Sequence, residues 1–371
     1  MATQHNLIST PRSLEIAITG KCSLRCTYCS HFSNQDPIYE DLPKKDWFIF
    51  FKELGKNSVM TVAITGGEPF LRPDIAEIVQ SIVDNRMRFS ILSNGTLITE
   101  DIACFLASLR RCDYVQISID GANDYTHDSC CGSGSFQKAI NGVNLLRKYK
   151  IPVFPRVTLH KQNFFHIKQI AHFLLEEMNF DYFWINSVSR LGMGRLNSKS
   201  VCLDSKEKAR AMFDLNQLSR KFGDRIQATA GPLAELKRFQ EMQHAKDSGL
   251  KTLDSGGYLI GCSCIWSQLA VRNDGMIIPC ILLPDLELGR INQNDLKTIW
   301  NSHPILTEMR QRQNINLSSI DFCNDCPYQN YCTGNCPAIA WSNIGRDLNH
   351  PDLDSCFRKF LAEGGILPFG Y

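Results

Sequence analysis

The sequence predicts an α/β fold: a partial (β/α)6 barrel of the TIM type followed by a cysteine-rich C-terminal domain. Two observations carry this prediction. Six short apolar segments before residue 186 are each followed by a segment of helical character. Eight of the sixteen cysteines lie after residue 260. Repeated strand–helix units imply a parallel sheet with right-handed crossovers, and six units cannot close a regular eight-stranded barrel.

The expected strands are the six apolar segments at 14–18, 62–65, 89–92, 115–119, 153–159 and 182–185. The expected helices lie at 43–56, 73–85, 99–110, 135–149, 163–178 and 204–221. Pro43 and Pro73 suit the first turn of a helix, and Thr99 is a candidate N-cap.

Three domains follow from this pattern: a barrel at 1–224, a bridging segment at 225–260 and the cysteine-rich domain at 261–371. The bridging segment contains an expected helix at 232–247. Asn273-Asp274-Gly275 predicts a hairpin between strands at 268–272 and 276–279, ahead of a helix at 295–312.

Composition excludes several classes of protein. The chain has 40 Lys+Arg and 38 Asp+Glu, so its net charge of +2 gives no argument for a nucleic-acid surface or a polybasic membrane anchor. No apolar run approaches the roughly 18 residues of a membrane span, and the N-terminus lacks the apolar region of a secretion signal. We therefore expect a cytoplasmic protein, in which sixteen cysteines indicate metal ligation or redox chemistry.

Cys22, Cys26 and Cys29 follow the first expected strand within eight residues. Three thiolates can bind a [4Fe–4S] cluster and leave one iron open to a small molecule, although zinc is a competing use of thiolates. The segment Gly66-Gly67-Glu68-Pro69 follows the second strand. Loops at the carboxyl ends of parallel strands share one face, where catalytic residues gather. The two motifs therefore predict an active site at that face.

The CxxxCxxC spacing and the GGEP segment resemble the radical S-adenosylmethionine (SAM) superfamily. The resemblance implies that the open iron chelates the amino and carboxylate groups of SAM, and that reductive cleavage yields a 5′-deoxyadenosyl radical that abstracts a hydrogen atom. It also implies that Gly66, Gly67, Glu68 and Pro69 hold the methionine amino group. Glycines would permit close backbone approach, and Glu68 would offer a charge-assisted hydrogen bond.

The resemblance implies further SAM contacts at Tyr28, Asn94, Ser118, Asp120 and Arg156. Strand-end capping is the alternative for Asn94, Ser118 and Asp120, and a barrel-interior ion pair is the alternative for Arg156. Many relatives have an Arg that contacts the SAM carboxylate where this chain has Cys131. Because Cys cannot form a bidentate pair, either Arg156 replaces that contact or the alignment differs here.

The C-terminal cysteines resemble the SPASM domain, an extension of some radical SAM enzymes that holds two auxiliary clusters. The resemblance implies one [4Fe–4S] cluster on Cys262, Cys280 and Cys336, with Cys264 as a candidate fourth ligand. It assigns the second cluster to Cys323, Cys326, Cys332 and Cys356. Structural zinc is the alternative. The expected cofactors are thus three [4Fe–4S] clusters and SAM.

SPASM proteins mostly modify peptides or proteins. The segments PRSLEIAITGKCSLRCTYCSHF, NRMRFSILSNGTLIT, AGPLAELK and YCTGNCPA resemble maturases of SynChlorMet-type and Nif11-type peptide cassettes. Some such maturases are spliceases, which excise a tyramine equivalent from a Tyr-Gly site and leave an α-keto-β-amino acid. The resemblance implies a ribosomal precursor peptide as substrate and an electron donor such as flavodoxin or ferredoxin. Because only 21 residues precede Cys22, we expect a separate small protein to recognise the leader.

Asp285, five residues after Cys280, is the candidate catalytic base, and a solvated loop Asp is the alternative. Two other kinds of function stay open. One is a different modification on the same scaffold: a thioether or C–C crosslink, an epimerisation or a sulfatase-type maturation. The other is a zinc-stabilised binding module. Product mass separates the first group, and iron content after anaerobic reconstitution separates the second.

Overall fold

The computed structural model describes residues 7–33, 35, 38–254, 256–260, 262 and 264–368. Within these residues a ten-stranded sheet has the order β10-β9-β8-β1-β2-β3-β4-β5-β6-β7. The strands are β1 Ser13–Ala17, β2 Thr61–Thr65, β3 Arg88–Ser93, β4 Cys112–Ser118, β5 Val153–Leu159, β6 Phe183–Ser187, β7 Ile226–Gln227, β8 Gln268–Val271, β9 Met276–Ile278 and β10 Gly289–Arg290.

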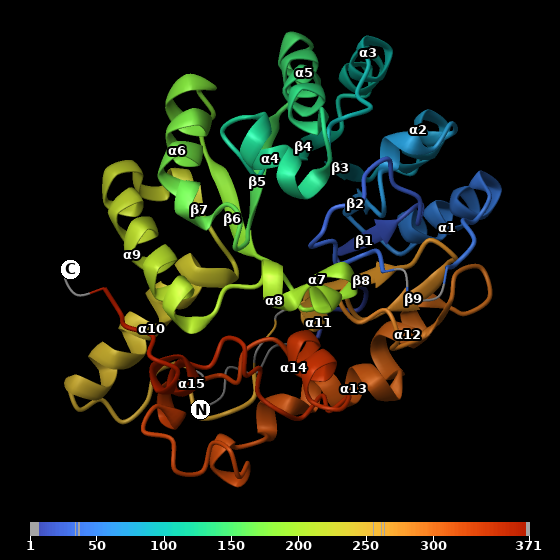
Figure 1. Cartoon of the computed structure of the whole chain (residues 1–371). Coiled ribbons are helices and arrows are strands. Elements are labelled where there is room, and N and C mark those ends of the chain that lie inside the picture. The colour runs from blue at the N-terminus through green and yellow to red at the C-terminus, as the bar shows by residue number, and fades with distance from the viewer. Residues whose placement is uncertain are drawn as a thin grey trace.

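Helices lie on the outside of this curved sheet, and the C-terminal segments lie below it (Figure 1). The helices are α1 Lys44–Lys56, α2 Ile75–Asp84, α3 Glu100–Ser108, α4 Asp124–Cys131, α5 Ser135–Lys148, α6 Ile167–His172, α7 Gly192–Leu196, α8 Ser198–Val201, α9 Ser205–Phe222, α10 Gly231–Asp247, α11 Cys264–Ser267, α12 Leu296–Ser302, α13 Pro304–Gln311, α14 Pro337–Asn343 and α15 Phe357–Ala362. A π-helical turn at Phe173–Glu177 continues α6.

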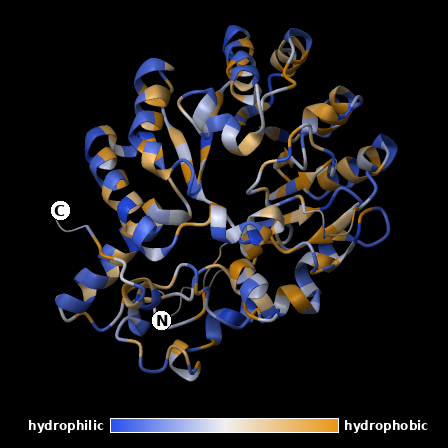
Figure 2. Ribbon diagram, in the orientation of Figure 1, coloured by the Kyte–Doolittle hydropathy of each residue, from blue (hydrophilic) through white to orange (hydrophobic). Residues whose placement is uncertain are grey.

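The barrel core forms because apolar residues recur along each strand and helix at the spacing that places them on its inner face. Helix α1 buries Trp47, Phe50, Phe51 and Leu54, a spacing that places them on one face of a helix. The outer helices accordingly carry both hydrophobic and hydrophilic residues (Figure 2). Strands β1 to β6 pair in parallel and in chain order. The predicted partial barrel of six strand–helix units is therefore confirmed.

Local sequence signals explain some element boundaries. The Thr99 hydroxyl accepts a hydrogen bond from the Ile102 N–H at 3.3 Å and caps α3 as expected. The single helix expected at 295–312 is wrong, because His303 adopts an extended backbone (ψ 129°) between α12 and α13. Pro304 disfavours the helical conformation at the residue before it and occupies the first position of α13.

The C-terminal region extends the barrel sheet. Strand β8 pairs in parallel with β1, from Ser13 opposite Gln268 to Ile16 opposite Val271, and the expected hairpin joins β8 to β9. Beyond α13 the chain runs mainly through turns and short helices, and its buried apolar residues form small separate clusters. In the described parts of the chain, no helix combines the length and apolar character that a bilayer crossing requires.

Candidate active site

The loop after β1 brings the thiols of Cys22, Cys26 and Cys29 together. The Cys29 N–H donates to the Cys26 carbonyl at 3.2 Å, which turns the chain between the last two cysteines. Burial, aided by the repulsion of Cys26 and Cys22, raises the pKa of Cys29 to about 11. Burial also raises the pKa of Cys22, with a further contribution from Cys26. These three half-buried thiols lie close enough for their charges to interact. They fit three of the four ligand positions of a [4Fe–4S] cluster.

The loop after β1 that carries Cys22, Cys26 and Cys29 is called the cluster loop below. The two glycines of the GGEP segment pack against its start. The Gly67 N–H donates to the Thr19 carbonyl and the Glu68 N–H donates to the Lys21 carbonyl, both at 2.8 Å. A Cβ at Gly66 would stand 2.3 Å from the Thr19 oxygen, and one at Gly67 would stand 2.0 Å from the Lys21 oxygen. The glycines are therefore required for the approach of two protein backbones, a reason that the sequence reasoning missed.

Glu68 is completely buried and connects the second strand to the third. Its carboxylate accepts hydrogen bonds from the Phe70 N–H at 3.1 Å, the Ser93 hydroxyl at 2.8 Å and the Asn94 N–H at 2.8 Å. Burial raises the pKa of Glu68 to about 7 against the opposing effect of these three donors. Pro69 follows as the first residue of a 3₁₀ turn that Glu68 caps.

Asn94 faces the cluster loop from the end of β3. Its side-chain amide donates to the Cys22 sulfur at 3.7 Å and to the Ser23 hydroxyl at 3.3 Å. Its carbonyl oxygen accepts from the Thr96 N–H at 2.9 Å, so the strand-end capping alternative is also realised. Ser118 is the last residue of β4 and stands opposite Arg156 in the sheet register.

Asp120 is a buried centre of hydrogen bonds rather than an exposed loop residue. Its carboxylate accepts from the Tyr28 hydroxyl and, at 2.6 Å, from the Thr158 N–H. Its own N–H donates to His127 Nδ1 at 3.0 Å, and its carbonyl accepts from the Asn163 amide at 3.0 Å. These contacts hold Tyr28 of the cluster loop against the end of β4.

Arg156 lies inside the barrel beside Glu15 of β1. Burial raises the pKa of Glu15 and lowers the pKa of Arg156, and each charge opposes the shift of the other. Burial, with Arg156 nearby, also lowers the pKa of His31. Glu15 and Asp120 therefore both lie close enough to act electrostatically on the guanidinium of Arg156.

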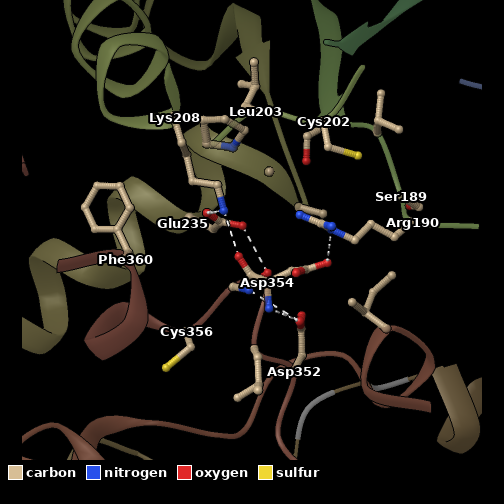
Figure 3. Close-up of a pocket in the computed structure, with 18 of the residues that line it drawn as sticks. Ser189, Arg190, Cys202, Leu203, Lys208, Glu235, Asp352, Asp354, Cys356 and Phe360 are labelled. Carbon is tan, nitrogen blue, oxygen red and sulfur yellow. Dashed lines mark hydrogen bonds and ion pairs between the residues drawn. The ribbon is translucent and has the colours of Figure 1, made fainter. Parts of the chain in front are cut away.

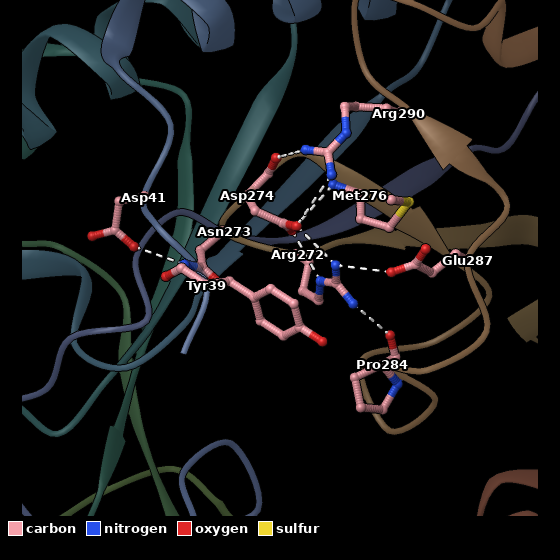
Figure 4. A network of polar contacts seen from close by, with 9 residues as sticks. All are labelled: Tyr39, Asp41, Arg272, Asn273, Asp274, Met276, Pro284, Glu287 and Arg290. Carbon is pink, nitrogen blue, oxygen red and sulfur yellow. Dashed lines mark hydrogen bonds and ion pairs between the residues drawn. The ribbon is translucent and has the colours of Figure 1, made fainter. Parts of the chain in front are cut away.

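A polar network that the sequence analysis did not predict fastens the β8–β9 hairpin to the cluster loop (Figure 4). Asp41 accepts from the Thr19 hydroxyl at 2.6 Å and from the Asn273 amide at 2.8 Å. Arg272 pairs with Asp274 at 2.8 Å and lies 3.6 Å from the centre of the Tyr39 ring. The only sequence signal here, Asn-Asp-Gly, predicts the hairpin and not its partners.

A second unpredicted element, α7, packs against the other side of the cluster loop. The Met193 N–H donates to the Phe32 carbonyl at 2.8 Å, and the Asn197 amide donates to the Thr27 carbonyl at 2.8 Å. A Cβ at Gly192 would stand 2.6 Å from the Cys29 carbonyl oxygen. The cluster loop is therefore fixed from both sides.

A cavity of about 270 Å³ opens at the barrel mouth between the glycine segment and the C-terminal region. Gly66 and Gly67 form one wall, and Asp285, Trp341 and Arg346 form another. Asp285 pairs with Arg346 at 3.4 Å, and their side chains are 52% and 71% exposed. The structure thus brings the candidate base to the cavity, on the side opposite the glycine segment.

Four C-terminal thiols converge in the first auxiliary set: Cys262, Cys264, Cys280 and Cys336. A hydrogen bond from Cys264 lowers the pKa of Cys262 to about 6, while contacts with Cys262 and Cys280 raise the pKa of Cys264. Burial raises the pKa of Cys336 to about 12, with Cys262 contributing. Cys264 therefore lies between two of the expected ligands, and the set fits a four-thiolate cluster.

The second auxiliary set gathers Cys323, Cys326, Cys332 and Cys356. Burial raises the pKa of Cys323 to about 12, and the other three thiols add to that effect. Burial, with Cys332 and Cys326 nearby, raises the pKa of Cys356 to about 11. All sixteen cysteines lie within the described residues, and none forms a disulfide. Largely half-buried thiols grouped in fours without disulfides fit metal ligation.

A second cavity, of about 290 Å³, lies between these two sets and the last strands of the barrel (Figure 3). Cys336 and Cys356 both line it. Lys208 of α9 pairs with Glu235 of α10 at 2.9 Å, and Arg190 pairs with Asp354 at 3.1 Å. The Arg190–Asp354 pair joins the barrel to the segment that carries Cys356, and the Lys208 ammonium also donates to the Asp354 carbonyl at 2.8 Å.

Comparisons with known proteins match two separate parts of the chain. Residues 16–174 match the Radical SAM superfamily, and residues 262–327 match the SPASM iron–sulfur cluster-binding domain. Among curated proteins, the AdoMet-dependent heme synthase of Methanosarcina barkeri is 26% identical over 91% of this chain and 95% of its own. The subtilosin biosynthesis protein AlbA of Bacillus subtilis is 25% identical over 89% of this chain and 68% of its own.

Among solved structures, Streptococcus suis SuiB bound to its precursor peptide SuiA superposes with a TM-score of 0.73 at 18% identity. The match covers 95% of this chain and 77% of SuiB. The fold is therefore shared along nearly the whole chain, including the cysteine-rich region.

Proposed function

We propose that this radical SAM enzyme with a C-terminal SPASM domain modifies a ribosomally made precursor peptide. The reaction we favour is that of a splicease, which excises a tyramine equivalent and leaves an α-keto-β-amino acid. Similarity to AlbA, a bacteriocin biosynthesis protein, supports the substrate class. The precursor, a separate leader-recognition protein and an electron donor such as flavodoxin or ferredoxin belong to the same proposal.

The observation that carries the proposal is the size and position of the cavity at the barrel mouth. Its volume of about 270 Å³ falls just below the roughly 300–1,000 Å³ typical of drug-sized ligands. Such a space suits one amino-acid side chain better than a macrocycle. Because Gly66 and Gly67 form its wall, a side chain in the cavity would lie beside the segment that the fold family uses for SAM.

We assign different residues of the chain to cluster binding, SAM binding and proton transfer. Cys22, Cys26 and Cys29 would hold the cluster, and the Gly66–Glu68 segment and Asn94 would border the bound SAM. When bound, the reduced cluster and SAM supply the 5′-deoxyadenosyl radical. Asp285 faces the cavity and would accept a proton from the peptide after hydrogen abstraction.

The auxiliary sets would be ligated by Cys262, Cys264, Cys280 and Cys336 and by Cys323, Cys326, Cys332 and Cys356, to give three [4Fe–4S] clusters in all. In this assignment Cys264 completes a four-thiolate set, because it contacts both Cys262 and Cys280. A fully ligated cluster has no open iron for substrate, so we propose that the auxiliary sets serve structure and electron transfer.

One experiment tests the proposed function: anaerobic incubation of the reconstituted enzyme with SAM, a reductant and candidate precursor peptides, read by mass spectrometry. The splicease assignment predicts loss of a tyramine equivalent. A product that has lost two hydrogens would instead indicate a crosslink. A product that has taken up deuterium without another change would indicate an epimerisation. Similarity to a heme synthase calls for a parallel arm with iron–porphyrin precursors. Turnover in that arm alone would reject a peptide substrate.

A further inference from the structure

Two buried arginines lie at the C-terminal end of helix α13. Arg310 is 7% exposed and Arg312 is 1% exposed. Arg310 donates to the Ile265 carbonyl at 3.2 Å and to the Trp300 carbonyl at 2.7 Å, and Arg312 donates to the His350 carbonyl at 3.5 Å. Within the described residues, neither guanidinium forms an ion pair with a carboxylate. A buried cation without a counter-charge is costly, so both residues need a physical explanation.

The deficit is larger at Arg312 than at Arg310. The Nε and Nη1 groups of Arg312 are buried and have no hydrogen-bond partner in the part of the chain that the structure describes. At Arg310 only Nη2 is in that position, and its guanidinium lies 4.5 Å from the centre of the Trp300 ring and 5.9 Å from that of Trp266. Unpaired buried donors cost free energy. Two unpaired donor groups and an uncompensated charge on Arg312 fit a negatively charged acceptor beside it.

Arg312 lies on the side of α13 that faces the first auxiliary set. Met309 is buried in an apolar cluster of the C-terminal region. Three thiols of the first auxiliary set pack against that cluster: Cys264, Cys280 and Cys336. Arg312 has helical backbone angles (φ −50°, ψ −33°), so the helical path continues through it. Because residues three apart on a helix share a face, Arg312 points to the same side as Met309.

The segment that accepts the hydrogen bond from Arg312 is itself fixed close to Cys336. His350, the acceptor, precedes Asp352 by two residues. The Asp352 N–H donates to the Gly334 carbonyl at 2.8 Å, two residues before Cys336. Contacts on α13 and contacts on the loop of Cys336 therefore place the Arg312 guanidinium beside the same thiol set.

The local charges agree with this placement. Burial lowers the pKa of Arg312 to about 10, and the charges of Cys336, Asp347 and Cys262 oppose that shift. Asp347 is exposed, so the buried groups that act on Arg312 are the two thiols. Burial alone lowers the pKa of Arg310 to about 10, without a contribution from any thiol. The two arginines thus differ in their relation to the first auxiliary set.

We propose that Arg312 is the counter-cation of the first auxiliary cluster and that its Nε and Nη1 groups donate hydrogen bonds to that cluster, which makes the cluster easier to reduce. Four thiolates on a [4Fe–4S] core leave a net negative charge, and this charge grows when the cluster accepts an electron. A cation with donors beside the cluster therefore stabilises the reduced state most. The proposal rests on the proposed cluster at the first auxiliary set, and it does not depend on the substrate.

Arg310 offers a matched control on the same helix. It is a buried guanidinium of the same size, but its donors serve the carbonyls of Ile265 and Trp300. Arg310→Met and Arg312→Met each remove one buried charge and one set of donors and keep an unbranched apolar stem. A general effect of losing a buried cation would appear at both positions. A direct effect on the cluster would appear only at Arg312.

The experiment is a potentiometric titration of the reconstituted full-length enzyme, followed by EPR. Addition of SAM identifies the signal of the N-terminal cluster, and Cys264→Ser identifies that of the first auxiliary cluster. Arg312→Met should move the midpoint potential of the first auxiliary signal to a more negative value and leave the other signals unchanged. Arg312→Lys, which keeps the charge but not the planar fork of donors, should lie between Arg312→Met and the native enzyme. Arg310→Met should match the native enzyme.

A second measurement detects the hydrogen bonds themselves. Pulsed EPR in D₂O should show an exchangeable-proton coupling on the first auxiliary signal of the native enzyme, and this coupling should be weaker in Arg312→Met. Equal potentials for the native enzyme and Arg312→Met would overturn the proposal, and so would equal shifts in Arg310→Met and Arg312→Met.

Iron content keeps the test decisive if a variant loses the cluster. Loss of about four irons per chain in Arg312→Met, with their recovery in Arg312→Lys, would support a counter-cation. The same loss in Arg310→Met would reduce Arg312 to a packing residue. Zinc in place of iron at this set in the native chain would reject the proposed cluster and Arg312 as its donor together. The titration needs no peptide, so failure of the proposed peptide modification would leave its result unchanged.

Discussion

The two cysteine-rich regions of this molecule differ in what holds their backbone in place. Cys22, Cys26 and Cys29 lie on a loop that the barrel core, the GGEP segment and α7 hold in place. The eight C-terminal cysteines lie among turns, short helices and small apolar clusters. In the first region the protein positions the thiols, and in the second the bound metal would position the protein. In the proposed function, this difference separates a reactive cluster from structural ones.

The largest expected effects come from removing one thiol in each region. Cys26→Ala should abolish 5′-deoxyadenosine formation and leave the fold intact, because the loop keeps its backbone contacts. Cys326→Ala should unfold the segment around the second auxiliary set, because little apolar core remains there. Hydrogen-exchange mass spectrometry measures the protection of the backbone amides in both variants. A similar loss of protection around Cys26 in the first variant and around Cys326 in the second would erase the distinction.

The glycine segment should be the most sensitive part of the barrel support. Gly67→Ala places a Cβ 2.0 Å from the Lys21 carbonyl oxygen, and the two backbones must separate. We expect a loss of about 3 kcal/mol in the free energy of unfolding. The control is Gly249→Ala, at φ +69° with open space around it, which should cost about 1 kcal/mol. Denaturant titrations under anaerobic conditions measure both, and equal losses would contradict the close-approach argument.

A pH effect should follow from Glu68, whose folded pKa of about 7 lies above its ordinary 4.5. Because the folded state holds the proton more tightly, this group stabilises most below pH 4.5, and that contribution is lost as pH rises to about 7. Between pH 6 and 7 the stability should fall by roughly 1 kcal/mol and then level off. Glu68→Gln should remove this slope in the measured free energy of unfolding. An unchanged slope would assign the titration to another group.

The smallest effect on stability, and a selective one on activity, is expected at Asp285. Its ion pair with Arg346 is exposed, so Asp285→Asn and Arg346→Gln should each change stability by less than about 0.5 kcal/mol. If Asp285 accepts a proton in the reaction, only Asp285→Asn should slow product formation relative to 5′-deoxyadenosine formation. Product ratios by liquid chromatography test this, and equal slowing in both variants would reduce Asp285 to a partner of Arg346.

Sequence reasoning predicted the barrel because the strands carry buried apolar residues, as Val62 and Ile64 do in β2, and segments of helical periodicity follow them. It predicted the thiol groups because cysteine spacing is rare and specific. It missed α4, whose segment Asp124–Cys131 is mostly polar, and it placed a single helix across Pro304.

The missed parts of the site share one physical property: each depends on contacts between residues far apart in the chain. Asp41 meets Asn273, and Tyr28 meets Asp120, across separations that no local pattern encodes. The glycines of the GGEP segment were assigned to a ligand, and the structure adds a second reason for them, the close approach of the neighbouring backbone. The sequence therefore predicted which side chains carry the chemistry, but not which distant residues they contact.

The most direct test of the account counts iron and asks which iron responds to SAM. The native chain, reconstituted without oxygen, should hold about twelve irons, and its EPR spectrum should change when SAM is added. A variant with Cys22, Cys26 and Cys29 all changed to Ala should hold about eight irons and show no such change. A triple variant that keeps about twelve irons, or whose spectrum still responds to SAM, would contradict the division into one open and two closed thiol sets.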